Sequence, residues 1–180
     1  MLFRSHLSEY LPERWQGREW ASGFTGSMAT LVVTLDQAML FADSRYWTQA
    51  EHELQGSGIG LFKIPTGAAT HHIGWIAEQL QAGQTLAVDG QVLGLALAQQ
   101  LRAALSLKSI ALNTQLDVLE AAWEDRPGLP LAPIYEHLPP QATVSRADKL
   151  REVRAAMARL GASHHLISSV DDVAWLLNLR

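Results

Sequence analysis

The feature that most constrains the fold is a pair of apolar runs that follow two closely spaced glycines near the N-terminus. The glycines lie in Gly23-Phe24-Thr25-Gly26, and the runs are Thr30–Leu35 and Ala38–Ala42. Only Asp36-Gln37 separates the two runs, which predicts an antiparallel hairpin. The glycines allow the tight backbone path that a chain needs between a helix and a strand. This segment is therefore expected to begin a sheet.

Strands and helices alternate after the hairpin. Ser44 is a suitable N-cap for a helix that contains Tyr46, Trp47, Ala50 and Leu54 at helical spacing. Further strands are predicted at Ile59–Ile64, Thr85–Val88 and Ser109–Leu112, and helices at Pro12–Trp20, around Ile73–Leu80 and at Val92–Leu105. This order predicts an α/β fold with a largely parallel or mixed sheet flanked by helices.

Composition excludes several classes of function. The chain has 180 residues, a net charge of −4 and no Cys, so disulfides and thiolate metal sites are excluded. Acidic and basic residues are spread evenly, which argues against nucleic acid as a partner. No apolar run approaches the ~20 residues that span a bilayer, and Met1–His6 lacks the apolar core of a signal peptide. We therefore expect a cytoplasmic protein with no membrane partner.

The composition changes at Trp123, which suggests a domain boundary. Residues 1–123 form the predicted first domain, and the proline-rich residues 124–144 form a predicted linker. Residues 145–180 are expected to be the truncated start of a second domain. There Ser145 caps a helix with an apolar stripe of Leu150, Val153, Met157 and Leu160, followed by a strand at His165–Ser168 and a helix at Asp171–Asn178.

No catalytic or metal-binding residue is predicted from spacing. The seven His include two adjacent pairs, His71-His72 and His164-His165, but neighbouring side chains diverge and no His-x-x-x-His occurs. A Gly-x-Ser-x-Gly nucleophile turn is also missing from the sequence, so a serine hydrolase is disfavoured. The glycines at 23 and 26 lack the spacing of a phosphate-binding loop.

Several separated motifs resemble the creatinase-like N-terminal domain of Xaa-Pro aminopeptidases, the aminopeptidase P family. The motifs are His6-Leu7-Ser8-Glu9-Tyr10-Leu11-Pro12-Glu13, Gly23-Phe24-Thr25-Gly26-Ser27, Asp43–Glu51 and Trp123-Glu124-Asp125-Arg126-Pro127. Lys149–Arg154 and Asp171–Arg180 are similar to the opening of the second domain in three-domain members. The resemblance covers nearly the whole chain and implies a creatinase/prolidase N-terminal-domain-like mixed sheet flanked by helices.

The resemblance implies a non-catalytic part of a larger enzyme. Members remove the N-terminal residue from peptides whose second residue is proline, using two divalent metals, with manganese expected, in a C-terminal catalytic domain. None of that domain's ligand motifs is present here, so no catalytic or metal residue is carried over. The N-terminal domain is expected to serve oligomerisation and to restrict the substrate cleft. An alternative interpretation is a stand-alone binding or assembly module without peptidase activity. A third interpretation is a small complete enzyme.

Three residues are candidates for facing the cleft or a neighbouring subunit: Phe24, Arg45 and Tyr46. An Arg at this point can bridge carboxylates or the polar groups of a peptide. A structural ion pair beside a core aromatic residue is the other interpretation.

The chain departs from the family pattern at its start. Only five residues precede His6, whereas members usually have a helix and a strand there. The tail, residues 145–180, carries such a helix–strand pair. It could take the position of the missing helix and strand in the first domain, either within one chain or by exchange between the two chains of a homodimer. The alternative is that the tail packs on the outside.

Overall fold

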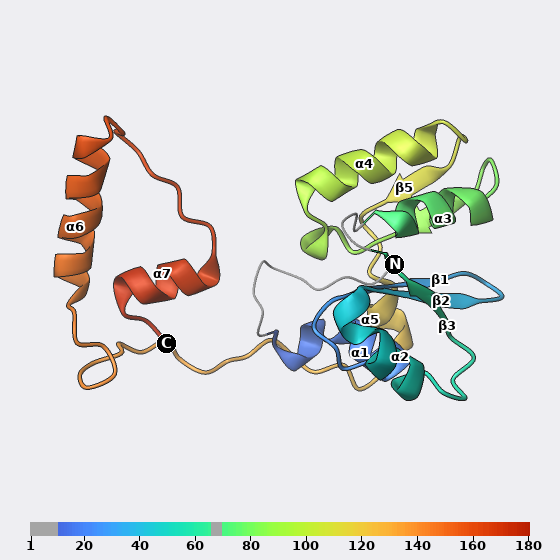
Figure 1. The fold of residues 1–180 in the computed structure, drawn as a ribbon, viewed down its shortest axis with the longest axis horizontal. Coiled ribbons are helices and arrows are strands. Elements are labelled where there is room, and N and C mark those ends of the chain that lie inside the picture. Colours follow the sequence, from blue (N-terminus) through green and yellow to red (C-terminus); the bar gives the residue numbers. More distant parts are fainter. Residues whose placement is uncertain (1–10, 66–69) are drawn as a thin grey trace. The chain divides into compact units, whose positions relative to one another are not determined.

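The computed structural model describes residues 11–65 and 70–180. The chain divides into two compact units, Met1–Leu129 and Pro130–Arg180. Each unit is described by itself below, with the element labels of Figure 1.

The first unit is built around the predicted hairpin. Strand β1 (Ala29–Val33) pairs antiparallel with β2 (Ala38–Ala42), with Leu31 opposite Leu40, and β2 pairs parallel with β3 (Gly60–Lys63). The hydroxyl of Thr34 closes the turn, because it accepts from the Gln37 backbone N–H at 3.1 Å. The expected mixed sheet is therefore confirmed.

The alternation of side chains along the hairpin creates a core on each face of this sheet. Val32 and Phe41 point into one core with Ile73 and Ile76, whereas Leu31 and Leu40 point into the other. Helices α3 (His71–Gln79) and α4 (Leu95–Ser106) cover the first core, and α2 (Trp47–Glu53) covers the second (Figure 1). The three layers explain why the hairpin runs are apolar on both faces.

A second, smaller sheet shares the core beneath α3 and α4. Strand β4 (Thr85–Ala87) pairs parallel with β5 (Ala111–Asn113), and Leu86 lies in the same cluster as Phe41. The described residues of this unit also form α1 (Gly17–Ser22), α5 (Val118–Ala122) and the short 3₁₀ turns η1 (Glu13–Trp15), η2 (Ser44–Tyr46) and η3 (Gly90–Val92).

Three helix starts differ from the predictions in the first unit, and one of them is the helix expected from Val92, which begins only at Leu95 after η3. The helix expected over Pro12–Trp20 is split into η1 and α1, and the helix cap expected at Ser44 is Asp43. The Asp43 carboxylate accepts the Arg45 backbone N–H at 3.0 Å, so the turn begins one residue earlier than expected. A carboxylate is at least as good a cap as a hydroxyl, and the local sequence offered both.

The second unit contains two helices, α6 (Arg146–Arg159) and α7 (Val170–Leu177). The predicted Ser145 cap is confirmed, because its hydroxyl accepts the Asp148 backbone N–H at 3.2 Å. The backbone N–H of His137 donates to the carbonyl of Asn178 at 2.7 Å. The strand predicted at His165–Ser168 is wrong: the segment has no regular structure. A strand needs a paired neighbour, and an apolar run alone does not supply one.

Candidate functional site

The three candidate residues gather around one loop, residues 23–27, between α1 and β1. Phe24 is completely buried and its ring meets that of Tyr46 edge-on, with centroids 6.0 Å apart. The guanidinium of Arg45 lies over the Tyr46 ring, 5.4 Å from its centroid. The structure therefore brings the three candidates together, with Phe24 as the buried member of the set.

Arg45 is an exposed side chain that pairs with Asp43, the residue that caps η2. Its Nη2 donates to Asp43 Oδ2 at 2.7 Å and its Nε donates to Oδ1 at 3.1 Å. These hydrogen bonds are the main reason that the pKa of Asp43 lies below its ordinary value. Exposed pairs of this kind stabilise a fold only slightly, so Arg45 can exchange Asp43 for another carboxylate at little cost.

Tyr46 links the same surface to the loop. Its hydroxyl forms a short hydrogen bond with the Ser27 hydroxyl, while its ring is half-buried against Phe24. A guanidinium and a phenol ring side by side can hold a carboxylate or the polar groups of a peptide. This pair is suited to contact rather than to bond cleavage.

A buried arginine beneath the loop was not predicted. Arg18 is 5% exposed, donates from Nη1 to the Ala29 carbonyl at 3.0 Å and from Nη2 to the Gly26 carbonyl, and lies 5.3 Å from the Phe24 ring centroid. It thus fixes both the loop and the start of β1. No pattern in the local sequence of α1 signals this role.

Glu53, at the end of α2, holds the outer side of the loop. Burial raises the pKa of Glu53, but hydrogen bonds from Thr25 and Gln49, together with the nearby His52, outweigh this effect and lower it overall. Gln49 and Glu53 are four residues apart on a helix, which is a weak signal that the two side chains are neighbours.

The exit from the first unit is also tied down. The rings of Trp20 and Trp123 stack with centroids 4.9 Å apart, and Arg126 donates to Asp117 Oδ2 at 2.5 Å and to the Arg14 carbonyl at 3.2 Å. The Trp123–Pro127 motif therefore fastens the end of this unit to its N-terminal turn.

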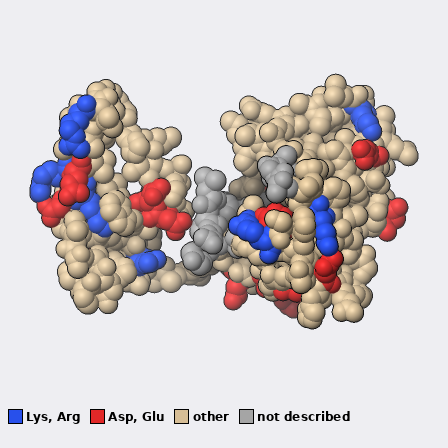
Figure 2. Space-filling view, in the orientation of Figure 1, with Lys and Arg blue, Asp and Glu red and all other residues tan. Residues whose placement is uncertain are grey.

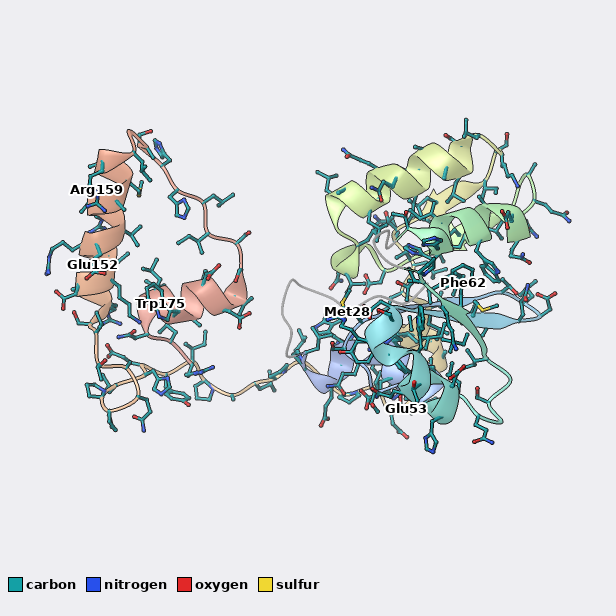
Figure 3. The ribbon with its side chains drawn as sticks, viewed as in Figure 1. Met28, Glu53, Phe62, Glu152, Arg159 and Trp175 are labelled. Atoms are coloured by element: carbon teal, nitrogen blue, oxygen red, sulfur yellow. The ribbon has the colours of Figure 1, made fainter. Side chains whose placement is uncertain are left out.

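The second unit has an open cavity of about 460 Å³, lined in part by Lys149, Glu152 and Trp175. Figure 3 labels Glu152 on α6 and Trp175 on α7. The Lys149 ammonium donates to the Trp175 carbonyl and to Asn178 Oδ1, each at 2.7 Å, and lies 4.3 Å from the Trp175 ring centroid. It closes the C-terminal end of α7, which is a structural role.

Among residues 11–65 and 70–180, no group of three His, Cys, Asp or Glu side chains could hold a metal ion. His164 instead shares a hydrogen bond of 2.9 Å with Ser163, and His6 lies outside the described residues. On the face drawn in Figure 2, acidic side chains (red) and basic side chains (blue) are interspersed. In the same described part, no helix is long and apolar enough to cross a membrane.

Comparison with known proteins identifies relatives of both units. Sequence models described as Creatinase/Prolidase N-terminal domain match residues 8–119 and, separately, residues 125–180. Aminopeptidase P2 of Arabidopsis thaliana is 34% identical over 98% of this chain, and Xaa-Pro aminopeptidase 2 of Sus scrofa is 33% identical over 98%. The chain spans only 25% and 26% of those relatives.

The fold has a matching solved structure. An X-prolyl aminopeptidase from Caenorhabditis elegans, described as a cytosolic enzyme with a di-nuclear active site, superimposes with a TM-score of 0.77 and 26% identity. The match covers 97% of this chain and 29% of that enzyme. The resemblance drawn from the motifs and the predicted fold class are both confirmed.

Proposed function

Because the chain belongs to the creatinase/prolidase N-terminal domain family, we propose that it is the non-catalytic N-terminal part of a metal-dependent Xaa-Pro aminopeptidase. The match over 98% of this chain but only about a quarter of its relatives carries the proposal. Catalysis would then belong to a C-terminal domain that holds two divalent metals, with manganese expected. The described residues offer no fitting ligand set, so no metal step is assigned to them.

The substrates of the whole enzyme would be peptides with proline in second position, and its location the cytoplasm, as described for the nematode enzyme. An assay of such a peptide with added manganese tests the proposal. The chain alone is expected to release no amino acid, whereas a longer product of the same reading frame is expected to do so. Hydrolysis by the chain alone would support the small complete enzyme instead.

Within that enzyme, we propose that the Arg45–Tyr46 surface borders the substrate cleft or a neighbouring subunit. Two observations support this. The Arg45 side chain is exposed and its ion-pair partner, Asp43, belongs to the same turn, and Tyr46 is only half-buried. Phe24 contributes from within, because its ring supports Tyr46.

Arg45→Ala in the longer enzyme is expected to raise KM about threefold or more, or to weaken the oligomer, with kcat unchanged, because it removes binding without touching the reacting atoms. Steady-state kinetics and light scattering measure the two effects. Arg102→Ala, an exposed arginine on α4, is the control and should change neither. If Arg45→Ala behaves like this control, the Asp43–Arg45 pair is merely structural.

We further propose a homodimer, with residues 145–180 exchanged between two copies as one form of it. The Leu150, Val153 and Met157 side chains are only half-buried, so they retain apolar surface for a partner. Because His165–Ser168 is not a strand, the structure gives no support for the same chain filling its own sheet. A monomeric mass in light scattering would contradict the dimer.

A further inference from the structure

The carboxylate of Glu53 gathers three donors around the loop of residues 23–27. The Thr25 backbone N–H donates to Oε2 at 3.0 Å, and the Thr25 hydroxyl donates to Oε1 at 2.7 Å. The Gln49 amide donates to Oε1 at 3.0 Å and to the Thr25 hydroxyl oxygen at 2.8 Å. One ionised side chain at the end of α2 therefore fixes both the backbone and the side chain of Thr25. Figure 3 labels Glu53 on α2.

Thr25 lies between the two residues that connect the loop with Tyr46. Phe24 precedes it and meets the Tyr46 ring, and Ser27 follows two residues later and bonds the Tyr46 hydroxyl. The loop begins at Gly23, whose φ of 70° lies in the left-handed region that favours glycine. A shift of Thr25 would thus reach Tyr46 from both sides.

We propose that Glu53 is a positioning residue, a latch that ties loop 23–27 to α2 and so sets the position of Tyr46, and that protonation of its carboxylate opens this latch. An ionised carboxylate only accepts hydrogen bonds and can serve all three donors. In a protonated carboxyl group, one oxygen carries a hydrogen and becomes a donor. That oxygen then faces the donors of Thr25 and Gln49 and can no longer serve them all.

Among the charged groups near the latch, His52 favours its closed state. His52 precedes Glu53 on α2 and its charge also lowers the pKa of Glu53. Glu51, on the same helix, is engaged with Lys63 at 2.6 Å, and Arg18 beneath the loop donates to Gly26 and Ala29. Since the pKa of Glu53 is lowered, the latch stays closed at neutral pH and opens only as the pH falls through that lowered value.

The test is residue-specific NMR on the 180-residue chain. In Glu53→Gln at neutral pH, the Thr25 amide is expected to exchange its hydrogen about tenfold faster than in the wild type. The ring resonances of Tyr46 are expected to shift as well, because an amide cannot accept from all three donors. Glu51→Gln, which removes a carboxylate from the same helix but not from the loop, should change neither signal.

Acidification supplies a second measurement that needs no variant. Wild-type Thr25 and Tyr46 signals should change together as Glu53 titrates, whereas in Glu53→Gln this acid transition should be absent. The proposal is wrong if the Thr25 amide exchanges as slowly in Glu53→Gln as in the wild type, or if the Tyr46 ring resonances do not change as Glu53 titrates. Its importance for assembly rests on the proposed contact role of Tyr46, but the latch is measured on the chain alone, so either can fail without the other.

Discussion

Replacing Arg18 by Met is expected to lower the free energy of unfolding of the first unit by about 3 kcal/mol. The guanidinium is buried and donates to the Gly26 and Ala29 carbonyls. A Met side chain fills similar space but leaves the buried Gly26 carbonyl and the partly buried Ala29 carbonyl short of a donor. Removing one partner of a buried polar group costs more than the hydrogen bond itself was worth.

The measurement is urea denaturation followed by tryptophan fluorescence in a Trp175→Phe background. The five remaining Trp all lie in residues 1–129, so the signal reports the first unit. Arg18→Lys should lose an intermediate amount, because an ammonium lacks the planar fork that serves two acceptors. Arg102→Met, at an exposed position of α4, should stay within about 0.5 kcal/mol of the parent. An equal, small loss in Arg18→Met and Arg102→Met would contradict the structural role.

The parts of the fold that the sequence predicted well are those fixed by local pattern. The hairpin follows from two apolar runs two residues apart, and α6 follows from the Ser145 cap and an apolar stripe. The strand at His165–Ser168 was wrong because strand formation depends on a partner elsewhere in the chain. The cap at Asp43 was missed because Asp43 and Ser44 are adjacent and both suit the position.

The site divides in the same way. Phe24, Arg45 and Tyr46 were singled out through the family motifs, and the structure brings them together. Arg18 and Glu53 were missed because their partners in loop 23–27 and at the start of β1 lie 8 to 28 residues away. Nothing in the local sequence distinguishes a buried Arg that serves backbone carbonyls from an exposed one. The burial of Phe24 likewise follows from long-range packing.

Gly26→Ala is expected to destabilise the first unit by about 2–3 kcal/mol, because the loop has no room for a methyl group. A Cβ at this position would overlap the buried Phe24 ring and lie 2.8 Å from Cδ1 of Tyr46. Both rings are held by neighbours, so the backbone must move and the Arg18 hydrogen bond to the Gly26 carbonyl must lengthen. The loss is therefore steric and does not depend on a glycine conformation.

Gly60→Ala is the matched control for this substitution. A Cβ there would also come within 2.8 Å of a neighbour, but that neighbour is the terminal methyl of Met39, which can rotate away. The expected change is below about 1 kcal/mol, measured by the same urea transition. If the two alanine variants lose equal stability, the rings around loop 23–27 are freer to move than the packing indicates. A large loss at Gly26 alone means that the loop and the Tyr46 surface form one closely packed feature.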